Sequence, residues 1–286
     1  MLYALISVAL WSTVATGFKL GLRELQPVQL LFLGCVVALA FFAAARPFVS
    51  APMNLRRHLA AASLGLLNPL GYYLVLFEAY DRLPAQIAQP LNYLWAVTLA
   101  LLAIPVLKQR LSARGWIGVA VSYAGVAVLL TRGGSAGLGR FDTVGVALAL
   151  GSTVLWAGYW LLTVRIGAHA VPLMLNGFAA ATVAIGAICA ATAGLPAITP
   201  ANLGYGAWVG LVEMGVAFVL WQRALALTAV AGRLGQLIFL SPFLSLVLIA
   251  TVLGERIHPS APVALAMIVA GLALSRRRSA RSERDA

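Results

Sequence analysis

Ten long apolar runs, separated by short polar turns, dominate this sequence of 286 residues. A helix needs about 20 apolar residues to cross the hydrocarbon core of a bilayer. With 62% hydrophobic and only 10% charged residues, against about 25% charged in a soluble domain, the chain cannot present a polar exterior. We therefore predict an all-α integral membrane protein with ten transmembrane helices. The runs occupy residues 2–20, 28–45, 58–78, 84–107, 115–131, 142–165, 171–192, 203–226, 231–253 and 260–275.

The two halves of the chain are similar to each other. Trp11 aligns with Trp156 at an offset of 145 residues, and Arg110 aligns with Arg256 at an offset of 146. Five spans in each half is an odd number, so the second half must enter the membrane upside down. Inverted repeats of this kind build many secondary transporters, whose site lies between the repeats. We predict two inverted five-helix repeats around a central cavity: residues 1–131 and 142–275, with a linker at 132–141 and a basic tail at 276–286.

The lysines and arginines indicate an orientation. More of them fall on the side of the membrane that holds the N-terminus, and the tail 276–286 adds five arginines to that side. Cytoplasmic loops are enriched in these residues, so both termini are predicted to be cytoplasmic. The tail has an alternative reading as a lipid-binding or partner-binding segment. No basic region precedes the first apolar run, which we interpret as a span and not as a cleaved signal peptide.

Several functional classes find no support in the sequence. No motif of a metalloprotease, a phosphate-binding loop or a nucleophilic hydrolase occurs, so we predict that the chain is not an enzyme. Three scattered histidines form no metal cluster, and Cys35 and Cys189 lie in apolar runs as small buried residues. The net charge of +12 sits in loops and the tail, which is an orientation pattern and not a nucleic-acid footprint. No cofactor and no metal are expected.

Glu213 lies in the middle of the eighth run. A carboxylate at that depth costs about 2.5–3.5 kcal/mol on insertion scales, so it must face the protein interior or water. It is a candidate proton carrier or a partner for a substrate amine. The alternative is a neutral, hydrogen-bonded packing residue.

The fourth run opens with a polar cluster. Gln86, Gln89 and Tyr93 share one helical face, and Asn92 stands beside them. Pro90 removes one backbone hydrogen bond and frees a carbonyl near that face, which makes it a candidate hinge. We predict that this face lines a cavity. The alternative is that these amides bond neighbouring helices to each other.

Other polar and aromatic residues stand at mid-depth in the remaining spans. Asn68 and Tyr72 are neighbours one turn apart, and Trp11 and Trp156 are too deep for an interfacial aromatic belt. Ordinary packing is the alternative for each of them. Pro242 is a second candidate hinge. The further predicted substrate-binding residues are Trp95, Tyr159, Gln236 and Ser241.

Three short motifs carry a resemblance to a known family. Leu253-Gly-Glu-Arg-Ile257 is similar to the L-G-E-R-L turn of the EamA branch of the drug/metabolite transporter superfamily, and Trp11-Ser-Thr13 resembles its first-span pattern. The first-half counterpart of Leu253–Ile257 is Leu107-Lys-Gln-Arg-Leu111, which departs from the family turn by replacing Gly-Glu with Lys-Gln. Leu91-Asn-Tyr-Leu-Trp95 looks like a segment of aromatic amino-acid exporters of the YddG type.

The resemblance implies export of amino acids, aromatic and other apolar ones favoured, across the bacterial inner membrane by alternating access. Protons are a candidate coupling ion. One alternative is an exporter of drugs or other small metabolites, although phosphorylated ones would need converging basic residues and only Lys19 and Arg233 are candidates. A second alternative is a membrane scaffold or sensor that transports nothing.

Overall fold

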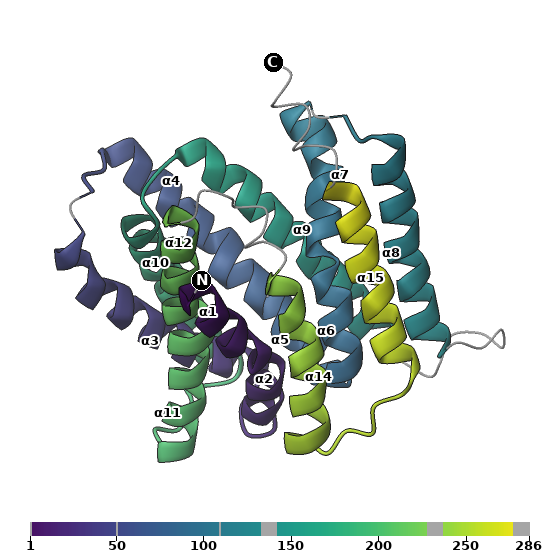
Figure 1. Cartoon of the computed structure of the whole chain (residues 1–286). Coiled ribbons are helices and arrows are strands. Elements are labelled where there is room, and N and C mark those ends of the chain that lie inside the picture. Colours follow the sequence, from purple (N-terminus) through teal and green to yellow (C-terminus); the bar gives the residue numbers. More distant parts are fainter. Residues whose placement is uncertain (1, 50, 109, 133–141, 228–236, 277–286) are drawn as a thin grey trace.

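Helices form all the regular structure that the computed structural model shows in residues 2–49, 51–108, 110–132, 142–227 and 237–276 (Figure 1). Eight stretches are long and apolar enough to cross a bilayer, and two shorter apolar helices, Ile238–Val252 and Ser260–Ser275, follow them. The prediction of an all-α membrane protein is confirmed. Residues 231–236 of the ninth predicted run lie outside the described residues. The eight stretches that are long and apolar enough to cross a bilayer are Leu2–Leu22, Pro27–Phe48, Leu55–Arg82, Ala85–Leu107, Ala113–Thr131, Thr143–Thr163, Ala170–Thr192 and Pro200–Trp221.

Four of the eight long spans are broken at mid-depth: Leu2–Leu22, Leu55–Arg82, Ala85–Leu107 and Pro200–Trp221. Irregular backbone in a membrane is tolerated only where protein or a cavity surrounds it. The breaks therefore indicate which spans face the interior. In chain order the helices are α1 (Leu2–Ser12), α2 (Val14–Leu22), α3 (Pro27–Ala45), α4 (Leu55–Gly65), α5 (Tyr72–Arg82), α6 (Ala85–Tyr93), α7 (Trp95–Leu107), α8 (Ala113–Thr131), α9 (Thr143–Ile166), α10 (Ala170–Thr192), α11 (Pro200–Ala207), α12 (Ala217–Ala226), α14 (Ser241–Val252) and α15 (Ser260–Arg276).

Two of the breaks occupy equivalent places in the two halves: a kink within Leu66–Gly71, where Asn68 has a non-helical backbone, and a π-helical segment at Trp208–Val216. Leu66–Gly71 separates α4 from α5, and Trp208–Val216 separates α11 from α12. At the sequence offset of 145 residues, Asn68 in the first segment corresponds to Glu213 in the second. Single π-helical turns are rare and occur often at functional sites. The third span of each half thus carries a buried polar residue at an irregular turn.

α8 and α15 contain the fifth predicted span of each half. They cross in close contact and run antiparallel (Figure 1). A Cβ added at Gly118 would meet the carbonyl oxygen of Gly271, and one at Gly125 would lie 2.8 Å from the carbonyl oxygen of Ala264. At the sequence offset of 146 residues, Gly118 corresponds to Ala264 and Gly125 corresponds to Gly271. The contact of Gly118 with Gly271 therefore corresponds to the contact of Ala264 with Gly125. The two close approaches are therefore reciprocal under this sequence offset.

Adding a methyl group at this crossing tests its contribution to stability. The Gly118→Ala substitution is expected to lower the midpoint of thermal unfolding in detergent, since overpacking costs about 1–3 kcal/mol. The matched control is Gly151→Ala in α9, where a Cβ would meet nothing within 4 Å. In the control, the better helix propensity of alanine should leave stability unchanged or raise it by about 1 kcal/mol. Equal effects of the two substitutions would contradict the close crossing.

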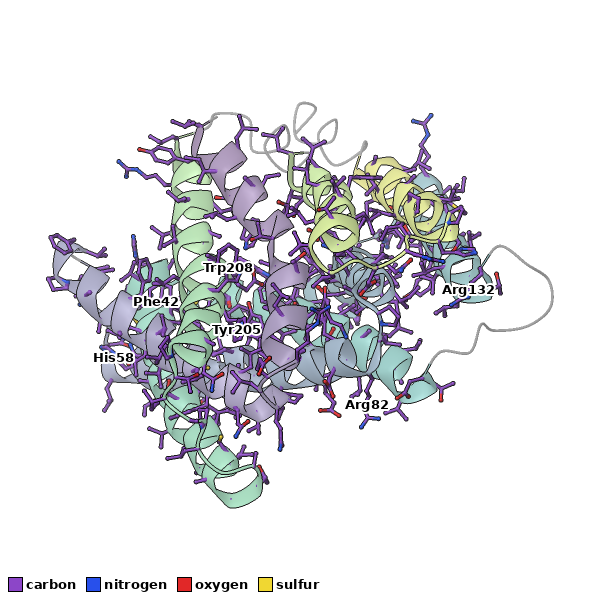
Figure 2. All side chains as sticks on the ribbon, turned by 90° about the horizontal axis from the view of Figure 1, so that it is seen from below. Phe42, His58, Arg82, Arg132, Tyr205 and Trp208 are labelled. Carbon is purple, nitrogen blue, oxygen red and sulfur yellow. The ribbon has the colours of Figure 1, made fainter. Side chains whose placement is uncertain are left out.

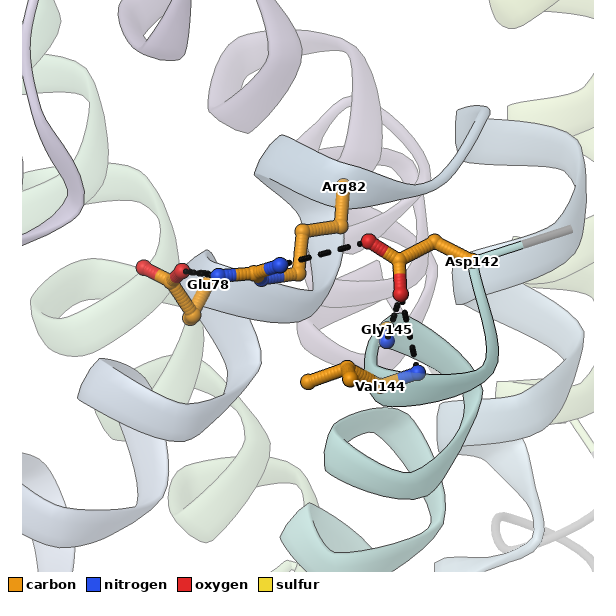
Figure 3. A network of polar contacts seen from close by, with 5 residues as sticks. All are labelled: Glu78, Arg82, Asp142, Val144 and Gly145. Atoms are coloured by element: carbon orange, nitrogen blue, oxygen red, sulfur yellow. Dashed lines mark hydrogen bonds and ion pairs between the residues drawn. The ribbon is translucent and has the colours of Figure 1, made fainter.

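In the described part of the chain, five α-helices begin with a hydrogen bond to the side chain of the residue directly before them. Asp142 is the clearest case, because its carboxylate accepts from the N–H groups of Gly145 and Val144 at 3.2 and 2.8 Å (Figure 3). These bonds, with the neighbouring Arg82, hold the pKa of Asp142 below its ordinary value. Arg82 also pairs with Glu78 at 2.9 Å. Side chains likewise cap α4 (Asn54), α8 (Ser112), α10 (His169) and α11 (Thr199).

Candidate functional site

The principal cavity lies between the two halves. Its empty space is about 820 Å³, the opening to solvent included. Side chains line it from α1, α2, α5, α6 and α7 of the first half, and from α9, the π-helical segment Trp208–Val216, α12 and Ile238 of the second. Residues that lie far apart in the chain therefore surround one space.

Aromatic rings form most of the cavity wall, with Trp156 at the centre. Its ring centroid lies 4.5 Å from that of Tyr72, 5.9 Å from Trp160, 5.9 Å from Phe218 and 6.4 Å from Trp95. The rings meet in tilted or edge-on arrangements, which are the favourable geometries for aromatic pairs. This wall offers flat apolar faces to a solute.

Glu213 supplies a buried carboxylate to the wall. The Tyr73 hydroxyl donates to its Oε1 at 3.0 Å, while Oε2 has no hydrogen-bond partner among the described residues. The residue is 9% exposed. A buried polar atom without a partner costs free energy, and a ligand that donates a hydrogen bond there would recover it. Glu213 Oε2 is therefore an acceptor that the described residues leave unsatisfied.

Two further unpartnered polar atoms belong to side chains of the same wall. In the described residues neither Gln89 Oε1 nor the indole N–H of Trp160 finds a partner, although both atoms are buried. Asn92 is better satisfied, since its Nδ2 donates to Ser152 Oγ at 3.1 Å and to the Tyr72 hydroxyl at 3.3 Å. The side chains of the wall thus carry two acceptors and one donor that no described residue satisfies.

The cavity is closed at one end. Phe18, Leu76, Tyr80 and Gln89 line the end that faces the α5–α6 turn, and they are only 1–3% exposed. Towards the opposite end, Trp221 and Ile238 are partly exposed. In this structure a solute would meet a barrier at the α5–α6 end. Figure 2 views the molecule from that end, with Arg82 labelled.

The structure brings most of the predicted site residues together. Asn68 and Tyr159 instead line a separate crevice against Met174, to whose sulfur the Tyr159 hydroxyl donates at 3.5 Å. Ser241 is fully buried at the start of α14, and Gln236 lies outside the described residues. Eight predicted residues line the principal cavity: Trp11, Tyr72, Gln89, Asn92, Tyr93, Trp95, Trp156 and Glu213.

The two predicted hinges occupy different positions. Pro90 stands inside α6, one turn before the break at Leu94 that separates α6 from α7. Pro242 stands in the first turn of α14, after the short 3-10 turn Ile238–Leu240. The apolar helix Ile238–Val252 is continuous through this point, so Pro242 lies where a 3-10 turn passes into an α-helix. Bending at either residue stays a prediction.

Sequence reasoning missed several cavity residues, and helical spacing would have found some of them. Trp160 is one turn after Trp156, so the two share a face of α9. Phe218 and Trp221 are similarly spaced in α12. Nothing in the sequence shows which face of these helices points inward. The missed residues are Val14, Ala15, Phe18, Leu76, Tyr80, Trp160, Phe218, Trp221 and Ile238.

The basic residues considered for a phosphate site do not form one in the described residues. The Lys19 ammonium donates to the carbonyl oxygens of Tyr80 and Leu83 at 2.6 and 3.1 Å, where α5 ends. Arg233 lies outside the described residues. In the described part of the chain no three His, Cys, Asp or Glu side chains come close enough to hold a metal ion.

Comparisons with known proteins agree with a transporter. The chain matches the EamA-like transporter family over residues 1–131 and 143–277. It is 27% identical to a probable terminal-alkyne amino-acid exporter of Streptantibioticus cattleyicolor over 98% of this chain and 94% of that protein. It is 30% identical to the threonine/homoserine exporter RhtA of Escherichia coli K12 over 84% of this chain and 77% of that protein.

A solved crystal structure shares the fold. It superposes with a TM-score of 0.66 at 23% sequence identity, over 96% of this chain and 97% of the other. With apolar helices along its length and a family match over nearly all of it, the chain belongs to the EamA-like transporter family and is a multi-pass membrane transporter.

Proposed function

We propose that this protein exports amino acids, with aromatic and other apolar ones preferred. Two relatives along most of its length carry the names of amino-acid exporters. The cavity supports the preference, because its wall is largely aromatic and contains few polar atoms. The single observation that carries the proposal is an unpartnered carboxylate oxygen, on Glu213, in a cavity walled by aromatic rings.

Each part of an amino acid finds a chemical counterpart in the cavity. The ammonium group donates to Glu213 Oε2 and Gln89 Oε1, and the carboxylate accepts from the indole N–H of Trp160. The apolar side chain then lies against the rings around Trp156, which bury area without requiring further hydrogen bonds. Protons are a second occupant of Glu213, as a coupling ion.

Alternating access between two inverted repeats is the proposed mechanism. The antiparallel, reciprocal contacts of α8 and α15 support an inverted relation between the halves. In the proposed orientation both termini face the cytoplasm of a bacterial inner membrane, as the distribution of lysine and arginine suggests. The α5–α6 turn then lies at the outer face, so the structure represents a state closed to the outside.

Counterflow in proteoliposomes tests the proposed substrate class. Proteoliposomes that contain the purified protein are loaded with one unlabelled amino acid. Uptake of labelled tryptophan, phenylalanine, leucine, threonine and aspartate is then compared with uptake into liposomes without protein. We expect uptake of the aromatic and apolar members and none of aspartate. A panel of cationic amphipathic drugs is run in parallel. Uptake of drugs with none of any amino acid would overturn the proposal in favour of a drug exporter.

Removing the indole N–H from the cavity tests carboxylate recognition. The Trp160→Phe substitution keeps an aromatic ring but loses the donor, so the KM for phenylalanine is expected to rise about three- to ten-fold, with little change in the maximal rate. Phenylethylamine, which lacks the carboxylate, is the comparison substrate and should compete equally with both proteins. A parallel loss for the amine would show that Trp160 contributes packing alone.

A further inference from the structure

Both helix ends at the α5–α6 turn are capped by charged side chains from distant parts of the chain. The Glu255 carboxylate accepts from the N–H groups of Ala85 and Gln86 at 2.8 and 3.2 Å, at the start of α6. Lys19 donates to the last carbonyls of α5 on the other side of the turn. A negative group at a helix start and a positive group at a helix end both interact favourably with the helix dipoles.

α6 differs in this respect from the locally capped helices. The residue before it is Pro84, whose side chain makes no capping hydrogen bond. α4, α8, α9, α10 and α11 each begin with a local side-chain cap. The free N–H groups at a helix start need an acceptor. For α6 that acceptor is Glu255, which belongs to the connection 253–259 between α14 and α15, in the opposite half.

Gln86 ties the same two segments together a second time. Its side-chain nitrogen donates to the Arg256 carbonyl at 3.0 Å and to Glu255 Oε2 at 3.3 Å. Its side-chain oxygen accepts from the His258 N–H at 2.9 Å. Gln86 is 8% exposed. The hydrogen bonds of Glu255 and Gln86 together fasten the start of α6 to the opposite half.

The hydrogen bonds of Glu255 and Gln86 lie directly beyond the closed end of the cavity. Gln89, one turn after Gln86 on α6, belongs to the closed end itself, and Tyr80 lies one turn before the α5–α6 turn. Moving the start of α6 away from the opposite half would open that end. It would also leave the N–H groups of Ala85 and Gln86 without their acceptor.

We propose that Glu255 is a positioning residue that latches the start of α6 to the opposite half and thereby holds the cavity closed at this end. The proposal rests on the alternating access proposed above. Opening on this side requires the carboxylate to leave the helix start. The glutamate of the Leu253-Gly-Glu-Arg-Ile257 turn has Gln109, a residue without charge, at the equivalent place in the first half of the sequence.

Cysteine accessibility tests the latch without any knowledge of the substrate. Cys35 and Cys189 are replaced with serine, and Leu76→Cys is introduced as a reporter at the closed end. Membrane vesicles of both orientations are treated with a membrane-impermeant maleimide. We expect Glu255→Ala to raise the labelling rate from the Glu255 face about ten-fold, the effect of one hydrogen bond to a charged group, and to lower labelling from the opposite face. Glu255→Asp should restore part of the closure.

The matched control is Glu24→Ala, which removes an exposed carboxylate from the α2–α3 connection at the same end. It should leave labelling unchanged. If Glu255→Ala fails to fold, Gln86→Leu removes the second set of bonds and should shift labelling in the same direction. Unchanged labelling, or an equal rise from both faces, would overturn the latch and leave Glu255 a purely structural cap. Because labelling needs no substrate, neither result bears on the amino-acid proposal.

Discussion

Replacing Glu213 with glutamine is expected to lower kcat/KM for amino-acid transport about ten- to a hundred-fold, the largest effect of any isosteric change in the cavity. Glutamine keeps the size of the side chain and one carbonyl oxygen for the Tyr73 hydroxyl. It removes the negative charge that faces the substrate ammonium. A hydrogen bond to a charged group contributes about 1.5–3 kcal/mol, which gives the expected range. Initial rates of counterflow in proteoliposomes measure it.

Two comparisons separate the role of Glu213 in binding from a role in folding. Tyr73→Phe removes the hydroxyl that holds Oε1 and should cost about two- to ten-fold, the range of a neutral hydrogen bond. Phenylpropionate lacks the ammonium group, and its weak competition should be the same for the wild type and Glu213→Gln. Loss of competition by phenylpropionate as well would contradict amine recognition.

If Glu213 also carries the coupling proton, Glu213→Gln should abolish the pH dependence of transport, and an unchanged pH profile would exclude that role.

The membrane spans were predictable because lipid imposes the same requirement on each of them. A span needs a minimum length and few charges, and both can be read from the sequence without knowledge of any contact. The sequence was also informative about Glu213, because a carboxylate at mid-depth must face the interior. The same logic selected Gln89 and Asn92, which stand in an otherwise apolar run and line the cavity.

The faces of the helices were harder to predict, and Asn68 shows the reason. Regular helical spacing places Asn68 and Tyr72 on one face, but the chain is kinked within Leu66–Gly71. The backbone of Asn68 is extended, with φ −147° and ψ 119°. The irregular turn rotates Asn68 away from Tyr72, so the two residues line different spaces. An irregular turn of this kind has no reliable sequence signal.

The hydrogen-bond partners of Glu255 are a second feature that could not be predicted from the sequence. Its turn was recognisable as a motif, but the groups that it binds lie at Ala85 and Gln86, far away in the chain. Pro84 in the position of a cap is the one local hint, because a helix start without its own cap needs an acceptor from elsewhere. Only the fold identifies which residue supplies it.

Replacing Trp156 with alanine is expected to change substrate preference more than any other single substitution in the aromatic wall. The indole contacts rings from α5, α7 and α12, so its removal opens a space at the centre of the cavity. Full burial of a leucine side chain is worth about 1.5–3 kcal/mol, and part of it would be lost with the indole. The KM for leucine should therefore rise about ten-fold, while tryptophan, whose own indole can fill the space, should lose much less. The ratio of kcat/KM for tryptophan to that for leucine measures the change.

The design must separate this effect from a loss of stability, because deleting a buried aromatic side chain commonly costs about 3–5 kcal/mol. Trp156→Phe keeps a ring and most of the packing, so it should fold like the wild type and show a smaller shift in the same direction. Trp116→Ala in α8 is the matched control, since Trp116 is 53% exposed and lies outside the cavity; it should leave the ratio unchanged. An equal fall in kcat/KM for both substrates would mean that Trp156 supports the wall without touching the solute. A rise in the ratio would place the substrate side chain against Trp156, on the same wall from which Glu213 presents its free oxygen.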